Sequence, residues 1–227
     1  MTRWDRRIER ARELEGQYPA AAEILRFYRG IMEFQKGLCA PVDRAARLPA
    51  LLDLVRRTGP ALLAEQAASA DPLAGPAGAF LTRVLEQPGL ESSALLAAAR
   101  GEINTSTVQA ACPFCSDKPV VAVLHVEGEG GKRSLVCNRC FTEWEFRRLL
   151  CPGCGEEEHA KLPVYTAAEF AHVRVEACDS CGQYIKCVDL TRNGLAVPEV
   201  DELAAVPLDL WAEGKGYRKL QANILAM

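Results

Sequence analysis

Cys112-Pro113-Phe114-Cys115 is the first of four Cys-x-x-Cys pairs that fall between residues 112 and 181. The other three pairs are Cys137/Cys140, Cys151/Cys154 and Cys178/Cys181. A Cys-x-x-Cys turn brings two thiolates close enough to bind one ion, and Zn²⁺ or iron accepts four such sulfurs at roughly 2.3 Å in a tetrahedron. Two pairs complete one site, so this stretch predicts two metal sites.

The spacing between the pairs indicates which of them share an ion. Residues 116–136 and 155–177 are each long enough for a β-hairpin, as in zinc-ribbon and rubredoxin-like modules. Residues 141–150 are shorter and fit a connector. We therefore assign Cys112, Cys115, Cys137 and Cys140 to site one, and Cys151, Cys154, Cys178 and Cys181 to site two.

The segments between the pairs have the composition of strands. Residues 120–126 are rich in valine, as expected of a strand. Glycines in 128–131 indicate a turn, and residues 134–136 form the returning strand. Residues 163–165 and 173–175 repeat this plan, and 183–188 form a further strand. The sequence thus predicts two tandem rubredoxin-like or zinc-ribbon modules of short antiparallel strands.

Two other uses of paired cysteines fit less well. Disulfide frameworks are typical of small secreted domains, but the charged residues 8–13 follow Arg6-Arg7 where an export signal would need an apolar stretch. A thioredoxin-like centre needs Cys-x-x-Cys at the start of a helix in a βαβ unit. None of the four pairs precedes a helical pattern.

Five further residues of ligand type lie outside the pairs. We interpret Cys39 as a loop or core thiol and Cys187 as a small buried residue on the same strand face as Ile185. His125, His159 and His172 could each replace a cysteine. Eight thiolates already complete two tetrahedral sites, which disfavours that role for the histidines.

Apolar residues at helical spacing predict an all-helical amino-terminal region, and the whole chain is predicted to be α+β. The expected helices are residues 4–15, Pro19 to Gly37, Leu48 to a stop at Gly59, one starting at Pro60, one around Phe80 ending near Pro88, and one from about Leu90 to Arg100. The predicted divisions are a helical domain (1–104), a first metal ribbon (105–150), a second metal ribbon (151–195) and a tail (196–227). In the tail an acidic helix should reach Leu203, and Leu208, Leu210 and Trp211 should pack on the ribbons.

Composition and missing motifs disfavour several classes of function. The 227 residues are 49% hydrophobic and 25% charged, and the formal net charge of -3 lacks the basic excess that nucleic-acid binding usually needs. No run approaches the ~18 apolar residues of a membrane span. No Ser-His-carboxylate pattern, P-loop or dinucleotide fingerprint is present. We therefore expect the chain to stay in the cytoplasm, where thiols remain reduced and available to metal.

Four motifs resemble one known family. They are Cys112-Pro113-Phe114-Cys115, Leu135-Val136-Cys137-Asn138-Arg139-Cys140, Thr142-Glu143-Trp144 and residues 176–186, which read EACDSCGQYIK. Together they resemble the formate dehydrogenase accessory protein family FdhE. The resemblance is strongest between Cys112 and Tyr217.

The resemblance implies a cytoplasmic maturation factor, not an enzyme, that binds the catalytic subunit of a respiratory formate dehydrogenase before export. It also implies rubredoxin-type iron in both four-cysteine sites, with zinc as the alternative because both metals accept four thiolates in the same geometry. Two other classes stay open: a zinc-ribbon nucleic-acid-binding protein and a rubredoxin-like electron-transfer protein. Trp144 is a candidate contact for the client, or else a core residue beneath site one.

The residue after each pair suggests a difference between the sites. Gly155 and Gly182 follow the pairs of site two and can adopt the left-handed turn from which backbone N–H groups reach sulfur. Ser116 and Phe141 stand at these positions in site one, so we expect the two sites to differ.

Overall fold

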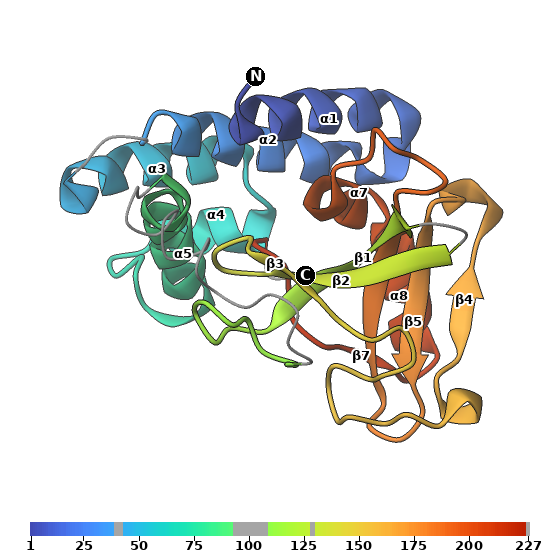
Figure 1. Cartoon of the computed structure of the whole chain (residues 1–227). Coiled ribbons are helices and arrows are strands. Elements are labelled where there is room, and N and C mark those ends of the chain that lie inside the picture. The colour runs from blue at the N-terminus through green and yellow to red at the C-terminus, as the bar shows by residue number, and fades with distance from the viewer. Residues whose placement is uncertain (39–42, 93–108, 128–129, 226–227) are drawn as a thin grey trace. The chain divides into compact units, whose positions relative to one another are not determined.

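The computed structural model describes residues 1–38, 43–92, 109–127 and 130–225. It is a mixed α+β chain that divides into two compact units, shown in Figure 1. Unit 1 comprises residues 1–99 and 224–227, and unit 2 comprises residues 100–223. Cys39 and most of the helix predicted from Leu90 to Arg100 lie outside the described residues.

Unit 1 is helical, as the sequence predicted. Its elements are α1 (Arg3–Gln17), a 3-10 turn (Pro19–Ala21), α2 (Ala22–Lys36), α3 (Arg44–Thr58), α4 (Ala61–Ala67) and α5 (Gly75–Ser92). Thr2 and Asp5 form a capping box at the start of α1. The helices enclose an apolar core that includes the fully buried Leu14, Leu25 and Ile31.

One predicted helix boundary in unit 1 is wrong. We expected the helix around Phe80 to end near Pro88, but α5 continues through Pro88 to Ser92. A proline inside a helix leaves the carbonyl four residues earlier without its N–H partner. That carbonyl belongs to Val84, and it accepts a hydrogen bond of 2.8 Å from the buried side-chain amide of Gln35. The replacement donor reduces the cost of the proline.

Unit 2 is built on one sheet with the order β3-β2-β1-β6-β5-β4, and β7 also pairs with β6. The strands are β1 (Pro119–Glu127), β2 (Gly130–Cys137), β3 (Glu143–Glu145), β4 (Val164–Thr166), β5 (Val173–Cys178), β6 (Gln183–Asp189) and β7 (Arg218–Lys219). Antiparallel pairs β1–β2 and β5–β6 form the two hairpins. A parallel pairing of β1 with β6, in register at Ala122 and Cys187, joins them into one sheet (Figure 1).

Two helices cover one face of this sheet. Helix α7 (Pro198–Ala204) packs on β1 and β6, and α8 (Val206–Gly214) packs on β5 and β7. The acidic helix predicted up to Leu203 is therefore confirmed as α7. Leu208 is buried as expected, but Leu210 is 68% exposed, so its predicted packing is wrong. Trp211 contacts Tyr165 edge-on, with ring centroids 4.7 Å apart.

A buried charge network fixes the helices to the sheet. The Lys186 ammonium, fully buried, lies 3.0 Å from the Glu202 carboxylate and 2.6 Å from that of Asp209. Lys219 pairs with the same two carboxylates, and the Tyr184 hydroxyl donates to Asp209 at 2.8 Å. Burial raises the pKa of Glu202, but the charges of Lys186 and Lys219 outweigh it and lower the pKa to about 2. The network thus contains two cations and two carboxylates.

Candidate metal centres

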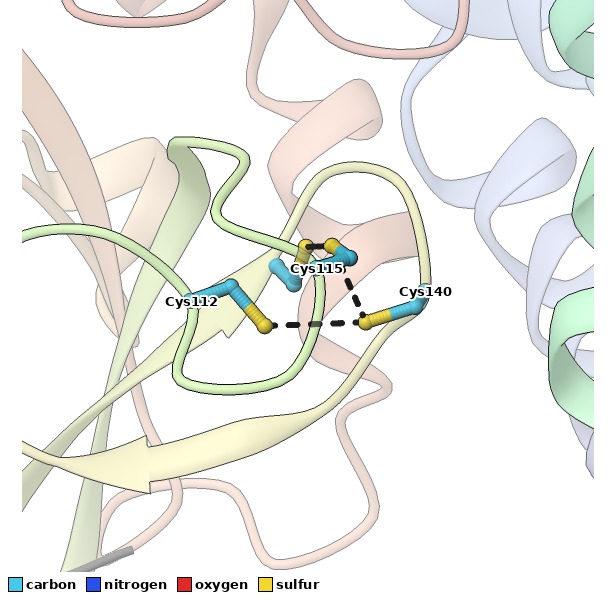
Figure 2. A group of neighbouring side chains, drawn as sticks. Cys112, Cys115 and Cys140 are labelled. Carbon is cyan, nitrogen blue, oxygen red and sulfur yellow. Dashed lines mark hydrogen bonds between the residues drawn. The ribbon is translucent and has the colours of Figure 1, made fainter. Parts of the chain in front are cut away.

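The structure brings the eight paired cysteines together in the two sets that the spacing predicted. The sulfurs of Cys112, Cys115, Cys137 and Cys140 lie within 4.8 Å of one another, and so do those of Cys151, Cys154, Cys178 and Cys181. In site one, one pair precedes β1, and the other begins at Cys137, the last residue of β2, so the hairpin brings the two pairs together. Figure 2 shows the sulfurs of Cys112, Cys115 and Cys140 turned toward one another.

In site two, the β4–β5 hairpin positions the ligands in the same way. Cys178 ends β5, and Cys181 lies in the turn that leads into β6. Cys151 and Cys154 come from the loop that precedes β4. Site two is also more open: Cys154 is exposed, whereas in site one three of the four cysteines are buried.

All four cysteine pairs share one backbone conformation. The residue after each pair has a positive φ: 61° at Ser116, 52° at Phe141, 78° at Gly155 and 65° at Gly182. Its N–H donates to the carbonyl of the first cysteine of the pair, at 2.8 to 3.2 Å. The expected difference between the sites is therefore absent from these backbone turns. Site one adopts the left-handed turn with two residues that have a Cβ, at a conformational cost of about 1–2 kcal/mol each.

Backbone N–H groups also point at the first sulfur of three pairs. Phe114 N lies 3.4 Å from Cys112 Sγ, Arg139 N lies 3.3 Å from Cys137 Sγ, and Gly153 N lies 3.3 Å from Cys151 Sγ. Such donors stabilise thiolate over thiol and orient it. The turns are therefore preorganised for thiolate ligands.

The sulfur separations fit a tetrahedral ion. Four sulfurs at roughly 2.3 Å from one ion lie about 3.8 Å apart. Three of the sulfur pairs in site one are 3.4 to 3.6 Å apart, two in site two are 3.7 and 3.8 Å apart, and all the sulfurs of a site lie within 4.8 Å of one another. A disulfide requires about 2.05 Å, so the disulfide alternative does not fit. Both clusters have the donor set and the spacing that Zn²⁺ or iron accepts.

Ionisation of one cysteine in site one changes the pKa of its neighbours. In site one, a hydrogen bond with Cys115 is the main cause that lowers the pKa of Cys112 to about 7, and contact with Cys112 lowers that of Cys140. The same contacts raise the pKa of Cys115 and Cys137. Each thiolate that forms makes ionisation of its neighbour harder. A divalent or trivalent cation eases this conflict because it binds the sulfurs directly and offsets two or three of the four thiolate charges.

Residues 111–148 match the family model described as FdhE, central domain, and residues 149–226 match the model described as FdhE, C-terminal domain. The two matches are adjacent, and together they cover both cysteine clusters and slightly more than half of the chain. The chain belongs to the FdhE family.

Individual FdhE relatives match about half of this chain. A "Protein FdhE homolog" from Aquifex aeolicus (strain VF5) is 37% identical over 115 residues, which are 50% of this chain and 41% of the relative. Another from Haemophilus influenzae (strain PittGG) is 34% identical over 113 residues, 49% of this chain and 37% of the relative. The match thus spans less than half the length of these curated relatives.

A solved FdhE structure shares the fold. The crystal structure of the FdhE protein from Pseudomonas aeruginosa superposes with a TM-score of 0.74 at 23% identity, covering 98% of this chain and 95% of that chain. The fold of this chain, a helical region followed by a strand-rich region, is thus that of a solved FdhE structure.

The remaining candidate residues lie outside both cysteine clusters of this FdhE chain. Trp144 is buried, and its indole N–H donates to the Gln109 carbonyl at 2.8 Å, so it is a core residue. Cys187 is fully buried, as expected. His172 bonds to Asp201 at 2.7 Å, and His125 lies 3.2 Å from the Ser134 hydroxyl. In the described part of the chain both clusters consist of cysteine alone.

Proposed function

We propose that this chain is a cytoplasmic accessory protein for the maturation of respiratory formate dehydrogenase, which binds the catalytic subunit of that enzyme before export. The observation that carries the proposal is the pair of adjacent FdhE family matches over residues 111–226. Within the described residues no helix is long and apolar enough to span a bilayer.

We further propose that both cysteine clusters bind metal, iron in preference to zinc. Cys112, Cys115, Cys137 and Cys140 would hold one ion, and Cys151, Cys154, Cys178 and Cys181 the other. A bound ion would crosslink strand ends, and iron would add a one-electron redox couple. The protein's own part is to present thiolates, direct N–H groups at them and shield site one from water.

In this proposal the two ribbons, crosslinked by their metal ions, form the surface that binds the client. Two short hairpins bury little apolar surface by themselves, so crosslinks at their ends add the rigidity that a binding surface needs. We assign site one to a ribbon of residues 105–150 and site two to a ribbon of residues 151–195, with residues 196–227 as the tail.

Two alternatives predict different behaviour. A nucleic-acid-binding zinc ribbon would need basic surface, whereas residues 105–195 carry a formal charge of about -2. An electron-transfer protein is favoured by one observation, the exposure of Cys154 at site two. Salt-dependent retention on DNA would support the first alternative, and reversible one-electron reduction by a reductase the second.

Metal binding is tested by stoichiometry. Protein purified without oxygen should contain two ions per chain, and the double variant Cys112→Ser/Cys115→Ser should contain one. The double variant Cys151→Ser/Cys154→Ser should likewise contain one, while Cys187→Ala, a control outside both clusters, should retain two. Loss of both ions from either double variant would refute independent sites.

Client binding is tested by capture. The metal-loaded chain should copurify with the catalytic subunit of formate dehydrogenase, and a deletion strain should make that subunit yet oxidise little formate. Full formate dehydrogenase activity in the deletion strain, together with no capture by the purified chain, would refute the proposed function.

A further inference from the structure

Unit 2 contains a cavity on the sheet face opposite α7 and α8. Ile185 alternates along β6 with Tyr184 and Lys186, whose side chains reach the α8 and α7 carboxylates, so Ile185 points to the other face. The loop that carries Arg148 to Gly153 covers part of that face. Between loop and sheet lies a cavity of about 550 Å³, within the size range of ligand sites.

The cavity wall is mainly apolar and adjoins site two. Ile185 and Leu220 are buried, while Leu149 and Val164 are 51% and 52% exposed. Cys151 and Cys178 of site two also line the cavity. Because large aliphatic side chains remain exposed beside the cavity, an occupant that covers them must extend beyond it.

Cationic groups are the second component of the wall. Arg133, Arg148 and Arg174 line the cavity together with a single carboxylate, that of Glu176. Arg133 and Arg174 both pair with Glu176, at 2.7 and 2.6 Å, and Arg133 is only 3% exposed. Among the described residues, Arg148 has no carboxylate partner. The wall therefore has a positive excess in a chain whose net charge is -3.

We propose that this cavity is a docking site for an extended segment of a protein partner that inserts a bulky apolar side chain and places a neighbouring Asp or Glu against the arginines. Apolar burial would supply most of the affinity, and the arginines would select an acidic neighbour. Val164, in the last strand on its side of the sheet, places the site next to an edge where an extended segment can lie.

The identity of the partner rests on the proposed function: the partner is the catalytic subunit of formate dehydrogenase. Overlapping short peptides that span this subunit, each with a fluorescent label, are the probes. Their binding to the metal-loaded full chain is measured by fluorescence anisotropy at low and high salt. The peptides that bind should combine a bulky apolar residue with an adjacent Asp or Glu, and their affinity should fall as salt rises.

Matched substitutions separate the cavity from the rest of the surface. Arg148→Gln should weaken peptide binding about two- to fivefold, whereas Arg147→Gln, which removes the same charge one residue outside the cavity, should change it less than about twofold. Leu149→Asp should weaken binding about tenfold or more, and Leu195→Asp, at an exposed leucine outside the cavity, should not. Thermal melting of all four variants is the control that they are folded.

The outcomes for the cavity and for the proposed function are distinct. Absence of peptide binding, or equal weakening by the cavity variants and their controls, would overturn the docking site even if the intact subunit is captured. Failure to capture the intact subunit while peptides bind with the predicted sensitivity would refute the proposed function and support the chemistry of the cavity.

Discussion

Replacement of Lys186 by methionine should be among the most destabilising single changes in unit 2. The ammonium is fully buried and compensates Glu202 and Asp209, so its loss leaves Lys219 as the one cation of the network beside two carboxylates. Breaking a buried charge network by removing one partner typically costs about 3–5 kcal/mol. Methionine preserves most of the side-chain volume, so the cost is electrostatic.

That free energy corresponds to a large shift in melting temperature. Unit 2 comprises residues 100–223, and for a domain of this size 1 kcal/mol shifts Tm by about 4 °C. Lys186→Met should therefore lower Tm of unit 2 by about 12–20 °C. The measurement is thermal denaturation of the metal-loaded chain followed by circular dichroism, with metal content determined before each melt.

Two further variants test the cause of this loss. Lys118→Met removes an exposed lysine and should change the free energy of unfolding by less than about 0.5 kcal/mol. Lys186→Met/Glu202→Gln removes one charge of each sign and should recover about 1–2 kcal/mol relative to Lys186→Met. A melt of Lys186→Met within about 3 °C of the wild type would refute the claim that this network holds the helices to the sheet.

Three smaller changes have equally specific outcomes. Gly182→Ala should lower the free energy of unfolding by about 1 kcal/mol, because the new Cβ meets no atom within 4 Å and only the positive φ opposes it; a loss above about 3 kcal/mol in a denaturant titration would contradict this account. Folding keeps the pKa of Glu202 low, so its stabilisation is complete above pH ~4.5 and is lost as pH falls toward about 2. Stability should accordingly fall more steeply with acid in the wild type than in Glu202→Gln, and parallel pH profiles would exclude this contribution. Trp144→Phe should lower the free energy of unfolding by about 1–2 kcal/mol through loss of the hydrogen bond to the Gln109 carbonyl, yet leave client capture intact. Loss of capture by a folded variant would instead indicate that Trp144 contacts the client.

The cysteine clusters were predictable because their signal is local. Ligand spacing groups Cys112 with Cys140 and Cys151 with Cys181 without knowledge of the fold, and the structure brings the same sets together. Helix ends at Gly37 and Gly59 were likewise predictable, since glycine and the following sequence stop a helix within one turn. Such features depend on a few neighbouring residues.

Features that depend on distant residues were not predictable from the sequence. Pro88 remains within a helix because Gln35, far away in the chain, bonds to the Val84 carbonyl. Lysine is a residue type usually found at the surface, and the burial of Lys186 depends on carboxylates contributed by α7 and α8. The cavity beside site two is likewise formed by a loop and separate strands. The local sequence around a lining residue such as Arg148 does not predict that it lines a cavity.

The parallel pairing of β1 with β6 sets an order of events during synthesis of the chain. All four cysteines of site one lie before residue 141, so the first hairpin can close and bring them together while β6 is still unmade. Until β6 is made, β1 has an unpaired edge that a β6 strand from another copy can occupy as well as its own. Slow elongation, or a break between the hairpins, should therefore favour strand-exchanged dimers in which each sheet combines two chains.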